Sequence, residues 1–164
     1  MINMENHMKR IITILLLVVC TATIGLTQAK KSGGNPLVGT WKVVEGTSAS
    51  GEKNSNPQPG LYIFTAKHYS MVAITGTQPR PKYTDQSKAT DKEKVAVFDQ
   101  LQANSGTYTF SGNTLKIRPV VAKNDFVVSR PELEFQVRID GNNLTVTATN
   151  GFNKGVVNKL IRIE

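Results

Sequence analysis

Beyond residue 36, most hydrophobic residues alternate with polar ones, which is the period of a strand with one buried face. Stretches rich in Gly, Asn, Ser and Pro separate these runs and predict turns and loops. We therefore expect eight strands, mostly in consecutive hairpins, which form an antiparallel meander. The expected strands are 39–45, 61–66, 69–75, 106–110, 114–121, 133–139, 144–149 and 156–163.

One segment breaks this alternation and predicts a helix. Thr90 or Asp91 can cap its start, and apolar residues follow at helical spacing through Phe98 and Leu101. We expect the helix to end near residues 104–106, and to lie between strands 3 and 4.

Eight antiparallel strands are about the number that closes into a barrel holding one small ligand. The predicted fold is therefore mainly β, an eight-stranded antiparallel up-and-down barrel formed by the single domain 37–164. Trp41 opens the first strand behind Gly39, and we interpret it as a core plug at one end of the barrel rather than a ligand-stacking residue.

Period-2 counting also selects the residues that face the barrel interior. For the second strand, either Leu61 and Ile63 or Tyr62 and Phe64 face inward, and the sequence leaves this open. The inward set either fills the barrel as core or leaves an apolar pocket with a few polar groups. The candidate ligand-binding residues are Tyr69, Met71, Tyr108, Phe110, Phe135 and Val137.

Residues 1–29 have the charged, apolar and small-residue order of a secretory signal, with Lys9-Arg10 before the apolar run. That run is short for a membrane span of about 20 residues. We expect cleavage after Ala29, a secreted or periplasmic protein, and a flexible linker at 30–36. The sequence favours this over a lipoprotein attached through Cys20, because Val19 does not fit the small residue that such sites carry before the cysteine.

Cys20 is the only cysteine, so a chain cleaved after Ala29 can form no disulfide and no thiolate site. The composition, 39% hydrophobic and 20% charged, is that of a globular protein. Its net charge of +8 is scattered, which allows peripheral contact with an anionic envelope. Nucleic-acid binding is not expected, because the sequence shows no phosphate-tracking basic stripe with stacking aromatics.

The sequence predicts no metal site, cofactor or catalytic set. His68 is the one histidine beyond the leader and lies at a predicted hairpin tip, without a cluster of further metal ligands. Glu45 is the one carboxylate on a predicted inward face with an aromatic residue, where a buried acid could move protons. A solvated Glu45 at the barrel rim is the simpler interpretation, because lone carboxylates are almost never fully buried.

Four segments resemble a known family, and two of them, the strand 60–66 and the hairpin 141–146, do so by their order along the chain. Residues 37–44, with Gly39-Thr40-Trp41, resemble the opening of lipocalin-like calycins, whose first strand carries Gly-x-Trp. Residues 91–99, followed by Gly106-Thr107-Tyr108, look like the helix-to-strand segment of small bacterial and fungal lipocalin-like domain proteins. The resemblance covers about residues 37 to 164.

This resemblance implies a barrel with a helix at one mouth and no assigned ligand. It also implies a basic residue from a late strand packed across Trp41, for which we select Arg162, with Lys159 and Arg138 as alternatives. Many relatives look as if they carry a histidine after the Gly-Thr-Tyr hairpin, whereas this chain has residues 116–119 (Lys-Ile-Arg-Pro) there. Any activity that depends on that imidazole is therefore not expected.

Together these observations predict an exported lipocalin-like barrel that binds a small apolar or amphipathic molecule without catalysis. Two alternatives stay open. One is an envelope interaction or structural protein with a basic outer face. The other is a small isomerase or cyclase that uses the barrel cavity, which requires Glu45 or His68 inside it. The sequence does not indicate an oligomeric state.

Overall fold

The computed structural model describes residues 34–130 and 132–164. The predicted signal segment, Cys20 and most of the predicted linker lie outside these residues. Among the helices that the structure describes, none combines the length and the apolar character needed to cross a bilayer.

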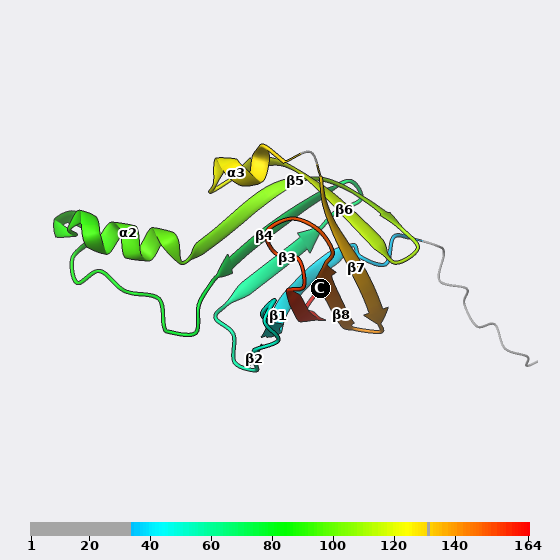
Figure 1. Ribbon diagram of the computed structural model, residues 1–164, viewed down its shortest axis with the longest axis horizontal. Coiled ribbons are helices and arrows are strands. Elements are labelled where there is room, and N and C mark those ends of the chain that lie inside the picture. The colour runs from blue at the N-terminus through cyan, green and yellow to red at the C-terminus, as the bar shows by residue number, and fades with distance from the viewer. Residues whose placement is uncertain (1–33, 131) are drawn as a thin grey trace, which may run out of the picture. The chain divides into compact units, whose positions relative to one another are not determined.

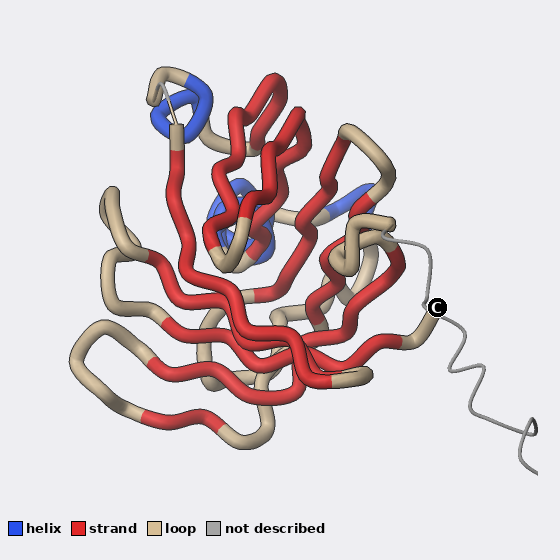
Figure 2. Tube along the Cα trace, turned by 90° about the vertical axis from the view of Figure 1, so that its right-hand side faces the viewer, coloured by secondary structure: helices blue, strands red, loops and turns tan. Residues whose placement is uncertain are grey.

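All strands belong to one antiparallel sheet with the order β2-β1-β3-β4-β5-β6-β7-β8-β9, and an additional pairing of β1 with β9 closes it. Figure 2 shows the strands curling around a common interior. Because β2 only extends the pairing at the end of β1, the predicted eight-stranded closed barrel is confirmed. The strands are β1 (Gly39–Thr47), β2 (Lys53–Asn54), β3 (Gly60–Phe64), β4 (His68–Ile74), β5 (Leu101–Ser111), β6 (Thr114–Ala122), β7 (Leu133–Asp140), β8 (Asn143–Ala148) and β9 (Val157–Arg162).

The described helical elements are a 3-10 turn η1 (Gln86–Lys88), the helix α2 (Asp91–Asp99) and the short helix α3 (Asp125–Val128). The prediction placed its helix between strands 3 and 4, and this is corrected to between β4 and β5. The difference arises because the loop expected at 46–60 contains the two-residue strand β2, which pairs with the end of β1.

The predicted start of α2 is confirmed, since Thr90 and Glu93 form a capping box. Its predicted end is wrong, because the helix stops at Asp99 and Leu101 already pairs with Ile74 of β4. Long-range backbone pairing has overridden the local helical spacing. No residue of α2 is buried, and the helix extends away from the barrel instead of covering a mouth (Figure 1).

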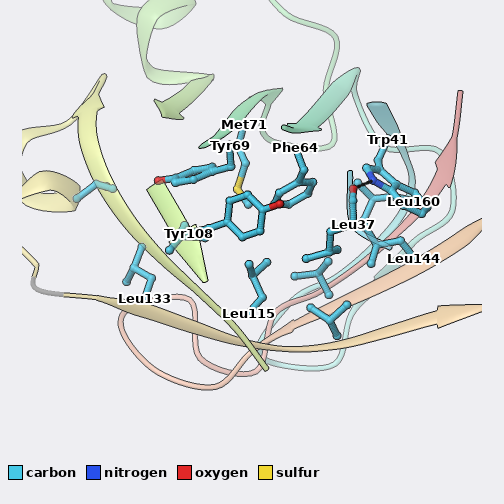
Figure 3. Packing of buried hydrophobic residues seen from close by; sticks show 14 residues of the cluster. Leu37, Trp41, Phe64, Tyr69, Met71, Tyr108, Leu115, Leu133, Leu144 and Leu160 are labelled. Carbon is cyan, nitrogen blue, oxygen red and sulfur yellow. Dashed lines mark hydrogen bonds between the residues drawn. The ribbon is translucent and has the colours of Figure 1, made fainter. Parts of the chain in front are cut away.

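The core concentrates at one end of the barrel. On β3, Tyr62 and Phe64 face inward while Leu61 and Ile63 are about two-fifths exposed, which settles the choice that the sequence left open. Figure 3 shows the packed side chains meeting from strands on all sides. The largest fully buried ones are Trp41, Phe64, Leu37, Leu115, Ile117, Leu144, Leu160 and Val146.

A β-bulge corrects the predicted inward face of Glu45. Val43 pairs with Leu160 and Glu45 with Lys159, so Val44 is the extra residue between them. An inserted residue reverses the alternation, and Glu45 consequently lies on the outer face. There its carboxylate contacts Lys159 at 2.8 Å and Lys53 at 2.9 Å.

Candidate ligand cavity

The first strand closes one end of the barrel through Trp41, whose side chain is completely buried. Its Nε1 donates a hydrogen bond to the Leu37 carbonyl at 2.8 Å. The Arg162 guanidinium lies 4.0 Å from the centre of the Trp41 ring and donates to the carbonyls of Val38 at 2.6 Å and Pro36 at 2.7 Å. Arg162 is also the cross-strand neighbour of Trp41. Indole, guanidinium and the entering chain therefore form one hydrogen-bonded plug.

Gly39 permits this arrangement. Its φ of +136° is rarely adopted by residues with a side chain, and a Cβ there would lie 2.5 Å from both Arg162 Nη1 and the Glu164 carbonyl oxygen. The glycine in front of the tryptophan thus leaves the space in which the arginine lies.

Tyr108 belongs to the same closed end. Its hydroxyl donates to the Thr65 carbonyl at 2.7 Å and accepts from Asn35 Nδ2 at 2.6 Å. Its ring meets Phe64 edge to face, with centroids 5.3 Å apart. Burial raises the pKa of the Tyr108 hydroxyl. With both hydrogen bonds made inside the protein, this tyrosine has a packing role.

The other end of the barrel holds a cavity of about 530 Å³. This lies within the range of roughly 300–1,000 Å³ that is typical of small-molecule sites. Its wall draws on every long strand of the barrel, on α3 and on the loops after β1, β4 and β8. The apolar part of the wall includes Val43, Met71, Ala73, Ile117, Val127, Leu133, Phe135, Val146, Ala148 and Phe152.

The polar part of the wall consists of amides, aliphatic hydroxyls, the Tyr62 phenol and two charged residues, Glu52 and Lys53. Asn158 Nδ2 donates to the Tyr62 hydroxyl at 3.1 Å, and burial raises the pKa of Tyr62 to about 12. Tyr62 therefore stays a neutral hydroxyl that can donate a hydrogen bond. Asn104 also lines the cavity, and its buried Oδ1 has no partner among the described residues. A ligand with a hydroxyl or amide donor would satisfy this acceptor.

Of the six candidate binding residues, the structure places Met71 and Phe135 in the cavity wall. Val137 is buried core and Phe110 packs against the core, while Tyr108 belongs to the closed end. Tyr69 is buried, its hydroxyl has no partner among the described residues, and burial raises its pKa. It does not line the cavity.

Glu45 and His68 lie outside the cavity wall. The Lys159 and Lys53 ammonium groups hold the pKa of Glu45 below its usual value, and His68 begins β4 at an exposed position. Across residues 34–130 and 132–164, no group of three or more His, Cys, Asp or Glu side chains gathers in a way that could hold a metal ion.

Several wall residues were not predicted. Gln102 and Asn104 were missed because their segment was assigned to the helix, although both fall on the alternation that continues to Tyr108. Asn158 shares the period of Leu160 on β9, and that spacing was the one signal for it. Val127 and Phe152 come from a short helix and a loop, where alternation gives no signal.

No protein-family profile matches the chain, and no curated protein matches it. Among solved structures, it is similar to a lipocalin-like protein from Bacteroides uniformis, with 13% identity, a TM-score of 0.46, and coverage of 77% of this chain and 98% of that one. It is also similar to an uncharacterized protein from Bacteroides eggerthii, with 11% identity, a TM-score of 0.45 and the same coverage of each chain. At these values neither likeness supports a function.

Proposed function

We propose that this protein binds a small apolar or amphipathic molecule in the open half of its barrel, without catalysis. The single observation that carries the proposal is the cavity of about 530 Å³ in a barrel whose opposite end is filled by Trp41 and its neighbours. A barrel that served only as a scaffold could pack both halves equally, because core packing stabilises the fold.

The chemistry of the wall supports an apolar or amphipathic ligand. Side chains such as Met71, Phe135 and Val146 offer the surface that an alkyl or aromatic group would contact. The neutral donors and acceptors of Tyr62, Asn104 and Asn158 can orient it. Neither Glu45 nor His68 reaches the cavity, so the two groups on which the proposed isomerase or cyclase chemistry depended do not support it.

The test is binding of the uncharged fluorescent probe N-phenyl-1-naphthylamine to the wild type and two matched variants. Ala73→Phe places a ring in the cavity, whereas Val72→Phe places the same ring on the outer face of the same strand, where Val72 is 46% exposed. We expect Ala73→Phe to weaken binding about tenfold or more, which corresponds to about 1.4 kcal/mol. Val72→Phe should leave it unchanged.

Circular dichroism must show both variants folded. Equal probe binding by the wild type and Ala73→Phe would overturn the proposal, as would a wild type that gives no probe signal. Native mass spectrometry of the protein purified from its own cells adds an independent readout, because a co-purifying small molecule would identify the ligand.

A second candidate function, peripheral contact with an anionic surface, is favoured by one row of outer-face residues. Lys42 pairs with Ile161 on one side and with Leu61 on the other, and Leu61 pairs with Val72. The three apolar side chains are 38–46% exposed. Sedimentation with anionic vesicles that is lost at high salt, and absent with neutral vesicles, would support this function. With the predicted export signal, such a surface would belong to the cell envelope.

A further inference from the structure

An aromatic and cationic cluster lies where α3 and the β8–β9 loop reach the cavity. Phe126 of α3 and Phe152 of the loop have ring centroids 5.8 Å apart. The Arg130 guanidinium carbon lies 4.4 Å from the centre of the Phe126 ring and 5.7 Å from that of Phe152. We call these three residues the rim cluster.

The rim cluster adjoins the cavity wall directly. Phe152 is itself a wall residue, and so is Val127, the neighbour of Phe126. A Cβ built on Gly151 would meet Leu133 Cδ2 at 3.2 Å and Arg130 Nη1 at 3.9 Å, so the guanidinium and a third wall residue, Leu133, both lie next to this glycine. Arg130 is therefore within reach of a ligand that fills the cavity and extends past its edge.

The charge of Arg130 has no counterpart in the described part of the chain. Its Nε is buried without a hydrogen-bond partner there, and none of the described ion pairs includes it. The basic wall residue Lys53 is, by contrast, paired with Glu45 at 2.9 Å. A guanidinium packed against two aromatic rings, with its Nε unpaired among the described residues, can present its planar fork to an oxyanion.

Both phenylalanine side chains of the rim cluster are about half exposed. Phe126 is 51% and Phe152 49% exposed, so about half of each side chain is open to solvent or to a ligand. The wall carries amides, hydroxyls and a phenol, which suit neutral parts of a ligand, and its one basic residue, Lys53, is already paired with Glu45. A charged head group is therefore expected at the rim and the uncharged remainder inside.

We propose that Arg130, stacked on Phe126 and Phe152, binds the anionic oxygen head group of an amphipathic ligand whose apolar part fills the cavity. This inference rests on the proposed binding function and narrows it to acidic amphiphiles. The head group is a carboxylate or a phosphate ester, since the guanidinium fork pairs with either.

The experiment compares decanoate, decyl phosphate and uncharged decanol as competitors of the uncharged probe. Arg130→Gln should weaken decanoate or decyl phosphate binding about tenfold, since hydrogen bonds to charged groups contribute at that scale. Decanol binding should not change. Arg138→Gln removes the same charge from an exposed position on β7 outside the cavity wall, and should alter none of the three affinities.

Arg130→Lys keeps the positive charge but removes the planar guanidinium fork. Its affinity for the acids should therefore lie between those of Arg130→Gln and the wild type. Decanoate and decyl phosphate distinguish a carboxylate from a phosphate head group, because the preferred ligand should show the larger loss of affinity in Arg130→Gln. An unchanged acid affinity in Arg130→Gln would overturn the inference, as would equal losses for acid and alcohol, which would mean that Arg130 only shapes the rim. In both cases decanol still binds and the proposed function stands. If the probe binds but neither acid displaces it, the inference fails and the proposed function stands. If the probe itself does not bind, the proposed function fails.

Discussion

Replacement of Trp41 by alanine tests whether the closed end is a structural plug. The indole is completely buried, donates one hydrogen bond to Leu37, and lies under the Arg162 guanidinium. Truncation of a buried Trp to Ala costs about 3–5 kcal/mol. About 1 kcal/mol of this reflects the lost hydrogen bond, and ~0.5–2 kcal/mol the lost cation–π contact. Against a typical total of about 5–15 kcal/mol, this loss is a substantial fraction of the stability of the fold.

Urea unfolding followed by far-UV circular dichroism is the appropriate assay, because Trp41 is the only tryptophan and its fluorescence disappears with it. The unfolding midpoint should fall while the slope with urea stays constant. Trp41→Phe keeps a ring and loses the Nε1 donor, so its loss of stability should be clearly smaller.

A double-mutant cycle of Trp41→Leu with Arg162→Met isolates the contact between indole and guanidinium, because Leu has no aromatic face and the carbonyls that Arg162 leaves unpaired are the same with and without the indole. We expect a coupling of about 0.5–2 kcal/mol. Neither residue lines the cavity, so Trp41→Phe should bind the uncharged probe as the wild type does. Retained stability in Trp41→Ala together with lost binding would refute the assignment of Trp41 to the plug.

Two further perturbations test other parts of the fold. Gly106→Ala should destabilise the barrel strongly, because a Cβ there would overlap the Arg118 carbonyl oxygen and press on the Pro119 backbone at 2.9 Å; a variant that melts like the wild type would show that β6 can move aside. For Glu45, hydrogen bonds from Lys159 and then Lys53 lower the pKa, so its contribution to stability is present above the unfolded-state pKa and is lost as pH falls through the folded-state pKa. Glu45→Gln should therefore reduce stability near pH 7, and this reduction should shrink progressively as the pH falls below about 4.3, the ordinary pKa of a glutamate. Urea titrations that show an equal change at pH 7 and at acid pH would contradict this origin.

The barrel could be predicted because its hairpins combine alternation with glycine-containing turns. Gly112 and Gly141 have φ of 58° and 56°, which the turns at Ser111-Gly112-Asn113 and Asp140-Gly141-Asn142 require. The failures have a common origin in non-local pairing. Residues 101–105 have apolar spacing that suits a helix, but hydrogen bonding to β4 makes them a strand. The bulge at Val44 likewise depends on β9, more than a hundred residues away, so the sequence around Glu45 gave no sign of the reversal.

The closed end was easier to predict than the cavity because the two ends differ in the residues that line them. A plug is made of large apolar residues at alternate positions, such as Trp41, Phe64 and Leu160, and that pattern is typical of a packed core. In the cavity, the inward-facing alternate positions hold small or amide residues, such as Ala73 and Asn158. Because the same residue types also occur on solvated faces, they do not identify a cavity wall in the sequence. Candidate ligand residues chosen for size therefore favoured the filled half, as Tyr108 and Val137 show. The more informative sign of a binding half is the abrupt change from large to small or amide residues along the inward face of single strands, as from Leu160 to Asn158 on β9.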